Sequence, residues 1–147
     1  MKAENYVTLE FLSRSANEGF ARMAAASFAA QLDPTLDEIG DIKTAVSEAV
    51  TNCIVHAYPE SVGDIYIWVG LFDDGLVRIR IRDRGCGIAD VRQAMEPLFT
   101  TLGGERAGLG FAVMESFMDK VRVRSAPNRG TSVTMDKLIK GRGDGQS

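Results

Sequence analysis

The chain has 147 residues, of which 45% are hydrophobic and 25% charged, with a formal net charge of −3 at pH 7. This balance indicates a soluble globular protein with a sizeable core, and it argues against a general nucleic-acid binder or a membrane-spanning protein. The N-terminal residues lack the apolar core of a signal peptide, and Cys53 and Cys86 have no metal-ligand spacing, so we expect a cytoplasmic protein with reduced thiols.

The first half of the chain is expected to form one strand and two helices. Residues 6–11 alternate between apolar and polar side chains, as in a short strand. A capping-box spacing then precedes each helix, at Ser15 and Glu18 and again at Thr35 and Glu38. The second helix should run to about His56, because its apolar residues recur at intervals of three and four.

The second half of the chain is expected to be rich in strands. Its predicted elements are strands over 64–72 and 76–83, a short helix over 88–95, a loop over 96–107, a helix over 108–118, and strands over 120–125 and 131–137. Because hairpins join most neighbouring strands, we predict an α/β two-layer sandwich, in which helices cover one face of a mostly antiparallel mixed sheet. We expect one domain over residues 1–139 and a disordered tail over 140–147.

The strand predicted over 76–83 ends on a carboxylate that is followed by two glycines, in the run RDRGCGI. Asp83, Gly85 and Gly87 do not form a dinucleotide fingerprint, because Asp90 stands where a third glycine is required. A carboxylate at a strand end can accept a hydrogen bond from the amine of adenine. Glycines, which have no side chain, let a flat or anionic ligand approach the backbone closely. Ordinary turn chemistry explains such a run about as often, so both interpretations stay open for this motif alone.

Three further sites have chemistry that would suit a nucleotide. Glu48 and Asn52 share one helix face, where the amide oxygen suits Mg²⁺ and the carboxylate can take a proton from an attacking hydroxyl. Gly108-Leu109-Gly110 opens a helix, whose unpaired amides can receive phosphate oxygens. The hydroxyl of Thr131 follows a turn and could reach a ligand. Singly, these sites could also be a solvated helix face, a flexible joint and a tight turn.

In this order, the motifs resemble those of the GHKL ATP-binding superfamily. SEAVTNCIVHAY, RDRGCGI, EPLFTT and GLGFAVMESFMDKVRV are similar to the anti-sigma F factor family of spore-forming bacteria, whose members are serine protein kinases. The resemblance extends from about residue 6 to 137 and implies the GHKL, or Bergerat, ATP-binding fold. It implies that Glu48 is the catalytic base, that Asn52 holds Mg²⁺ and that Asp83 binds adenine. The other residues it implies for ATP or ADP are Gly85, Gly87, Ile88, Thr100, Thr101, Arg106, Gly108, Leu109, Gly110, Phe111 and Thr131.

The resemblance also implies a function and partners. It implies an anti-sigma factor that sequesters a sporulation sigma factor of the sigma F type and phosphorylates an anti-anti-sigma protein on serine. It implies a homodimer, partner contact through Arg22, and an ATP lid over 97–107, with no direct contact to nucleic acid or membrane. Two alternatives remain: a nucleotide-sensing binding switch without useful kinase activity, and the general-stress anti-sigma kinase.

Two side-chain patterns lie outside these motifs. His56, the single histidine, is expected to have a structural or supporting role at a helix end. The sheet face opposite the helices should carry Tyr66, Trp68, Phe72, Arg78, Arg80 and Arg82, together with Arg122 and Arg124. Because interfaces are enriched in aromatic residues and arginine, we hypothesise that part of this face serves dimerisation or partner docking.

Overall fold

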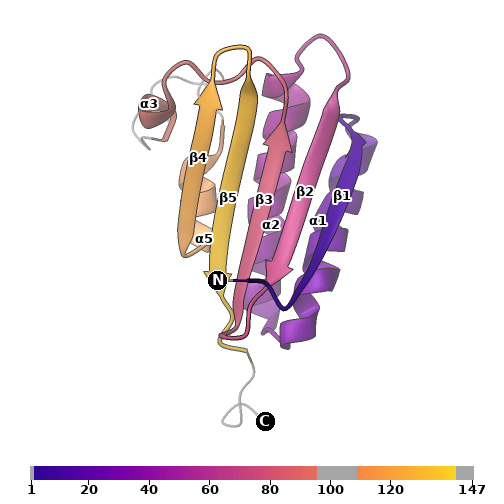
Figure 1. The fold of residues 1–147 in the computed structure, drawn as a ribbon, viewed down its shortest axis with the longest axis vertical. Helices are drawn as coiled ribbons and strands as arrows, with labels where there is room; N and C mark the ends of the chain where they lie inside the picture. Colours follow the sequence, from indigo (N-terminus) through magenta and orange to yellow (C-terminus); the bar gives the residue numbers. More distant parts are fainter. Residues whose placement is uncertain (1, 96–108, 142–147) are drawn as a thin grey trace.

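The computed structural model, which describes residues 2–95 and 109–141, has a sheet in front of a layer of helices (Figure 1). Five strands pair in the order β1-β2-β3-β5-β4. They are β1 (Asn5–Leu12), β2 (Asp64–Leu71), β3 (Leu76–Asp83), β4 (Lys120–Ala126) and β5 (Gly130–Leu138). All four pairings are antiparallel, so the described part of the sheet lacks the parallel pairing that a mixed sheet would contain.

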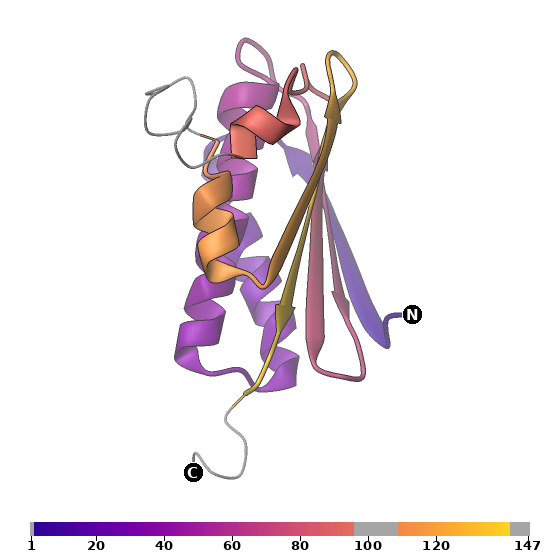
Figure 2. The same cartoon turned by 90° about the vertical axis from the view of Figure 1, so that its left-hand side faces the viewer.

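The helices lie on a single face of the sheet (Figure 2). They are α1 (Ala16–Ala29), α2 (Leu36–Asn52), α3 (Val91–Met95) and α5 (Phe111–Phe117), with shorter helical turns at Ala30–Leu32 and Cys53–Ala57. The predicted order of elements is confirmed, and most predicted strand limits lie within one or two residues of the observed ones. In the described part of the chain, every helix is too short or too polar to span a bilayer.

Alternation along the strands fixes which side chains form the core. Ile65, Ile67 and Val69 of β2 and Val77, Ile79 and Ile81 of β3 are at most 1% exposed, as the apolar periodicity predicts. Their partners on α1 are four alanines, Ala21, Ala25, Ala26 and Ala29. Because alanine adds little bulk, α1 can lie close to α2 and the sheet. Burying each large apolar side chain stabilises this packing by roughly 1.5–3 kcal/mol.

Only one of the two predicted capping boxes forms. Thr35 Oγ1 accepts from the Glu38 amide at 3.1 Å, and Glu38 Oε1 accepts from the Thr35 amide at 2.9 Å. Ser15 instead has helical backbone angles and makes no side-chain capping bond within the described residues. Glu18 accepts from the Ser47 hydroxyl of α2 at 2.7 Å, so a tertiary contact has replaced the local one.

The end of α2 also differs from the prediction. The α-helix ends at Asn52, and the chain continues to Ala57 as a turn of π-helix. Such turns often occur at functional sites, because they displace the side chains that follow them. At the far end of the chain, the amides of Lys140 and Gly141 donate to the Glu38 carboxylate at 2.8 and 3.0 Å. The rest of the predicted tail lies outside the described residues.

Candidate functional site

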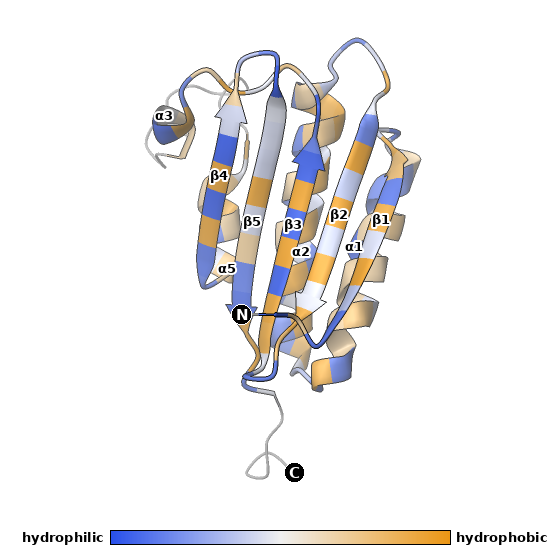
Figure 3. Ribbon diagram, viewed as in Figure 1, coloured by the Kyte–Doolittle hydropathy of each residue, from blue (hydrophilic) through white to orange (hydrophobic). Residues whose placement is uncertain are grey.

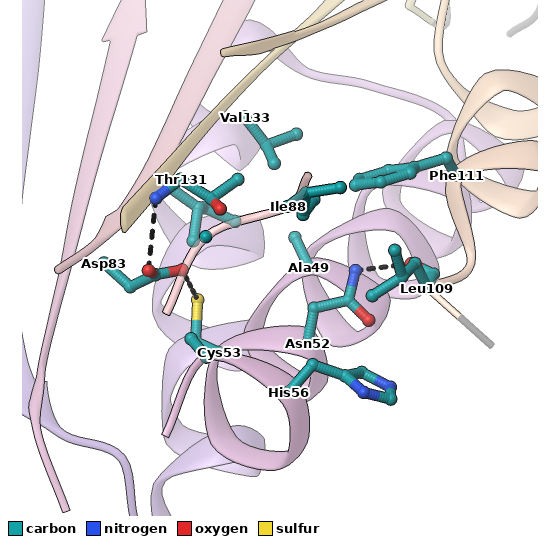
Figure 4. A pocket seen from close by; sticks show the side chains of 13 residues that line it. Ala49, Asn52, Cys53, His56, Asp83, Ile88, Leu109, Phe111, Thr131 and Val133 are labelled. Atoms are coloured by element: carbon teal, nitrogen blue, oxygen red, sulfur yellow. Dashed lines mark hydrogen bonds between the residues drawn. The ribbon is translucent and has the colours of Figure 1, made fainter. Parts of the chain in front are cut away.

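Asp83 ends β3 with its carboxylate buried beneath the sheet, only 5% exposed (Figure 4). Its Oδ1 accepts from the backbone amides of Gly85 at 2.9 Å and Thr131 at 3.2 Å. Its Oδ2 accepts from the Cys53 thiol at 3.4 Å. Burial raises the pKa of Asp83 above its usual value, and these three donors offset part of that rise. The result is a carboxylate held in place with acceptor capacity left over.

Two glycines after Asp83 allow the chain to pack closely on itself. A Cβ at Gly85 would overlap the carbonyl of Ala57, and one at Gly87 would overlap that of Ala126. Gly87 also has a φ of +76°, a conformation that other residues rarely adopt. The close approach that these glycines permit is therefore to the chain's own backbone, which fixes the loop against the π turn and β4.

Hydroxyl groups hold this loop from both sides. Tyr58 Oη accepts from the Arg84 amide at 2.7 Å and donates to the Asp64 carbonyl at 2.9 Å. Ser125 Oγ of β4 accepts from the Ile88 amide at 2.7 Å and lies 2.8 Å from Thr131 Oγ1. Asp83 is thus positioned by elements that are distant in sequence.

A small cavity lies between Asp83 and α2, with mostly apolar walls. It is lined by Ala49, Asn52, Cys53, His56, Ala57, Ile81, Asp83, Gly87, Ile88, Leu109, Phe111, Thr131 and Val133, and its volume is about 30 Å³. That volume suits a water molecule or two, whereas pockets for small organic ligands measure roughly 300 Å³ or more. The chemistry of the walls suits a flat, largely apolar ring that offers a donor to Asp83. The cavity must widen before such a ring can enter.

Asn52 and Glu48 lie on successive turns of α2 and both meet the segment that enters α5. The Asn52 amide nitrogen donates to the Leu109 carbonyl (Figure 4). One turn earlier, a Cβ placed on Gly110 would overlap the Glu48 carboxylate. Gly110 has a φ of +68° and precedes the first residue of α5. The structure therefore brings Glu48, Asn52 and the start of α5 together beside the cavity.

The donor set near Asn52 limits which metal the site could hold. Within residues 2–95 and 109–141, no group of three or more His, Cys, Asp or Glu side chains could hold a metal ion. With its amide nitrogen bonded to Leu109, Asn52 offers Oδ1 as the available ligand atom. One protein oxygen fits Mg²⁺, which commonly keeps several waters and shares substrate phosphates.

Comparison with known proteins identifies the family. The family model of the histidine kinase-like ATPase domain matches residues 11–137. An anti-sigma F factor of Caldanaerobacter subterraneus subsp. tengcongensis is 56% identical over 140 residues, covering 95% of this chain and 97% of that protein. An anti-sigma F factor of Bacillus subtilis is 52% identical over 138 residues, covering 92% and 94%. The chain belongs to the anti-sigma F factor family.

Solved structures share the fold of this anti-sigma F family member at low sequence identity. The RsbU and RsbW domains of a Mycobacterium tuberculosis protein match with a TM-score of 0.66 and 21% identity, over 92% of this chain and 32% of that chain. A mycobacterial sensor histidine kinase, MprB, matches with a TM-score of 0.57 and 16% identity, over 93% and 99%. The predicted two-layer GHKL arrangement is confirmed.

Several residues that the family resemblance implies for nucleotide or partner binding do not line this cavity. Gly85 supports the loop but is absent from the cavity lining. Arg22 lies on α1, in a groove of about 500 Å³ that also includes Lys43, Ser47 and Glu48. This groove is distinct from the cavity, yet Glu48 belongs to its wall. Thr100, Thr101, Arg106, Gly108 and the segment 97–107 lie outside the described residues.

Three residues at the anti-sigma F family site were not predicted from the sequence. Cys53 donates to Asp83, and burial, together with the negative charge of Asp83, raises the pKa of its thiol and keeps it protonated. Its position directly after Asn52 could have indicated a role in the site, but it also continues the apolar spacing of the helix, which predicted only core packing. Tyr58 and Ser125 hold the loop through tertiary contacts, for which the sequence carries no local signal.

Proposed function

We propose that this chain is an anti-sigma factor and an ATP-dependent protein serine kinase. It sequesters a sporulation sigma factor of the sigma F type and phosphorylates an anti-anti-sigma protein on serine. The single observation that best supports this proposal is the placement of Glu48 and Asn52 on adjacent turns of α2, both in contact with the start of α5. Membership of the anti-sigma F factor family adds the partners.

Nucleotide recognition would begin at Asp83. Its buried carboxylate accepts a hydrogen bond from the exocyclic amine of adenine, while Ile88, Leu109 and Phe111 cover the ring. Because the cavity holds only about 30 Å³, it must widen for the ring to enter, and we propose that the Leu109 segment moves outward. That movement breaks the hydrogen bond from Asn52 and frees the amide for the phosphate end of ATP.

Phosphoryl transfer would then depend on positioning and charge. The acceptor serine oxygen attacks the γ-phosphorus of ATP, the bond to the β–γ bridging oxygen breaks, and ADP leaves with that electron pair. The proton of the serine hydroxyl passes to the Glu48 carboxylate. When bound through Asn52, Mg²⁺ neutralises the negative charge that develops on the phosphates. Asn52 orients the phosphates relative to Glu48 from one turn away on the same helix.

The groove between α1 and α2 would receive the protein partners. Arg22 and Glu48 line the same groove, so a partner that contacts Arg22 can present a hydroxyl to Glu48. Glu18 lies 3.7 Å from Arg22 Nε and accepts from Ser47, which links the two helices. We further propose a homodimer, supported by the exposed Tyr6 side chain, which stacks on the half-buried Trp68 on the outer face of β1 and β2.

The first test is the intact mass of an anti-anti-sigma protein after incubation with this chain and Mg-ATP. Wild type should add one phosphate, and Glu48→Gln should lower the rate by about 10²–10⁴-fold, the usual contribution of a general base. ATP affinity, measured in parallel, should be unchanged in the variant. Phosphate transfer at the wild-type rate by Glu48→Gln would exclude Glu48 as the base. Intact ATP and partner binding without any transfer would favour the binding switch.

A further inference from the structure

The outer face of the sheet carries an ordered cluster of arginines over β3, β5 and β4. Register places Arg80 beside Thr134 and Thr134 beside Arg122, so that two arginines flank one hydroxyl. The next row repeats this order with Arg82, Ser132 and Arg124. We call this surface the arginine trough, with Arg80, Arg82, Arg122 and Arg124 as its walls and Ser132 and Thr134 as its floor. Charged and apolar residues alternate along β3 and β4 (Figure 3).

The trough is a concave surface rather than a flat row of charges. A hollow of about 420 Å³ is lined by Arg80, Arg122, Arg124, Ser132 and Thr134. A second hollow, which includes Arg82, Arg124 and Ser132, continues it towards the β4–β5 turn. The small floor residues leave this space, because β5 lies between two strands that both carry long side chains.

The guanidinium groups of Arg80 and Arg82 are held in place but not neutralised. Arg80 lies 5.6 Å from the ring centre of Trp68, and Arg82 lies 4.9 Å from that of Tyr66. Cation–π contacts of this kind position the arginines while leaving their charge uncompensated. Among the described residues, Arg80, Arg82 and Arg124 have no carboxylate within ion-pair distance.

In the neighbouring row, a carboxylate stands at the floor position and is bound by arginines. There Asp136 occupies the floor position between Arg78 and Lys120. Arg78 donates to both of its oxygens, at 2.8 and 3.0 Å, and Arg122 lies 3.6 Å from one of them. A carboxylate at floor level is therefore bound by arginines from both walls, whereas the two rows with hydroxyl floors lack this anion.

We propose that the arginine trough binds an extended acidic segment of a protein partner, with carboxylates on alternate residues. The two hydroxyl rows are two residues apart along β5, which is about 7 Å in a strand. Alternate side chains of an extended segment have the same spacing and direction. Each carboxylate would take the place that Asp136 holds in the third row, between two guanidinium groups and above a hydroxyl donor.

Neither protection of a sheet edge nor nucleic-acid binding accounts as well for the arginine trough. Cations on an edge strand can prevent unwanted sheet pairing, but Arg80 and Arg82 lie on β3, an inner strand that needs no such protection. A nucleic acid would also neutralise arginines, but the chain's net charge of −3 repels long polyanions and Asp136 closes one end of the trough. The trough lies on the face of the sheet opposite the helices, so it is separate from the groove proposed for catalysis (Figure 2).

The test is fluorescence anisotropy of labelled peptides with the full chain. The probe is Glu-Thr-Glu-Thr-Glu, and its control is the isomer Glu-Glu-Thr-Thr-Glu, which has the same charge but no two glutamates on alternate residues. The alternating peptide should bind at least about threefold more tightly. Thr134→Asp, which adds a floor carboxylate like Asp136, should weaken binding of the alternating peptide by about tenfold. Thr51→Asp, the same change at an exposed position of α2 on the helical side of the sheet, should leave it unchanged.

A second variant and two alternative occupants complete the test of the arginine trough. Arg124→Gln, on the exposed edge strand, should weaken peptide binding by about threefold, whether or not Thr134→Asp folds. Equal binding of the two peptides, or full binding by Arg124→Gln, would overturn the proposal. Tighter binding of a five-nucleotide oligothymidylate that depends on Arg124 would assign the trough to nucleic acid instead. Loss of peptide binding as the chain self-associates would assign the trough to a second copy.

Discussion

Asp83 is buried, and we propose that its charge is needed to bind the nucleotide; one substitution can test both the burial and the charge. In Asp83→Asn, the remaining oxygen can still accept from the amides of Gly85 and Thr131, which both donate to Oδ1. The new amide group would face the Cys53 sulfur and could not accept from adenine. We expect nucleotide affinity to fall by about ten- to a hundredfold, the effect of losing one charged hydrogen bond. Isothermal titration calorimetry with ATP measures this loss.

The same variant should change how stability depends on pH. Burial raises the pKa of Asp83, so the native state binds this proton more tightly than the unfolded state does. The corresponding stability is complete below the ordinary carboxyl pKa and is lost as pH rises through the raised pKa. Asp83→Asn lacks this loss, so its stability relative to wild type should increase with pH over that window. Urea unfolding from pH 4 to pH 7 tests the sign, and a relative decrease would contradict it.

At the scale of an element, Glu38 fixes both the start of α2 and the segment after β5. Glu38→Ala removes the capping-box acceptor for Thr35 and the acceptor for Lys140 and Gly141. We expect a loss of about 1 kcal/mol or more in the free energy of unfolding, measured by urea denaturation. Glu60→Ala, which alters an exposed glutamate outside these contacts, should have little effect. An equal loss in both variants would show that charge, not the cap, matters.

Acid should weaken the Glu38 contact. Burial alone would raise the pKa of Glu38, but the backbone amides of Thr35, Lys140 and Gly141 outweigh it and lower the pKa. Stability from this carboxylate is therefore present above the ordinary glutamate pKa and is lost as pH falls through the lowered one. The difference between wild type and Glu38→Ala should shrink below about pH 4.

The elements themselves follow from local pattern, whereas their ends and the site depend on tertiary contacts. Periodicities of two and of three to four predicted the strands and helices, because one face of each is buried. The cap at Ser15 was wrong because Glu18 bonds to Ser47, which is 29 residues away. Asp83 was recognisable from its glycines, but the donors that hold it come from Cys53 and Thr131, which no local pattern connects to it.

For the whole molecule, the two faces of the sheet have different roles. The inner face packs on helices that carry the candidate site (Figure 2). The outer face has an aromatic surface, made by Tyr6 of β1 and Trp68 of β2, beside the arginine trough. Tyr6 is 61% exposed and stacks on Trp68 with ring centres 6.2 Å apart. Exposed aromatic pairs are enriched where proteins associate, so this surface is the expected contact of the proposed homodimer.

This assignment predicts that Tyr6→Glu weakens self-association and leaves the affinity for ATP unchanged. The carboxylate would be buried against an aromatic surface in the dimer, and we expect the dimer dissociation constant to rise at least about tenfold. Sedimentation velocity over a concentration series measures the change. Leu36→Glu is the matched control, because Leu36 is 84% exposed on the helical side of the molecule. If Leu36→Glu dissociated the dimer and Tyr6→Glu did not, the contact would lie on the helices, where it would compete with partners for the groove at Arg22.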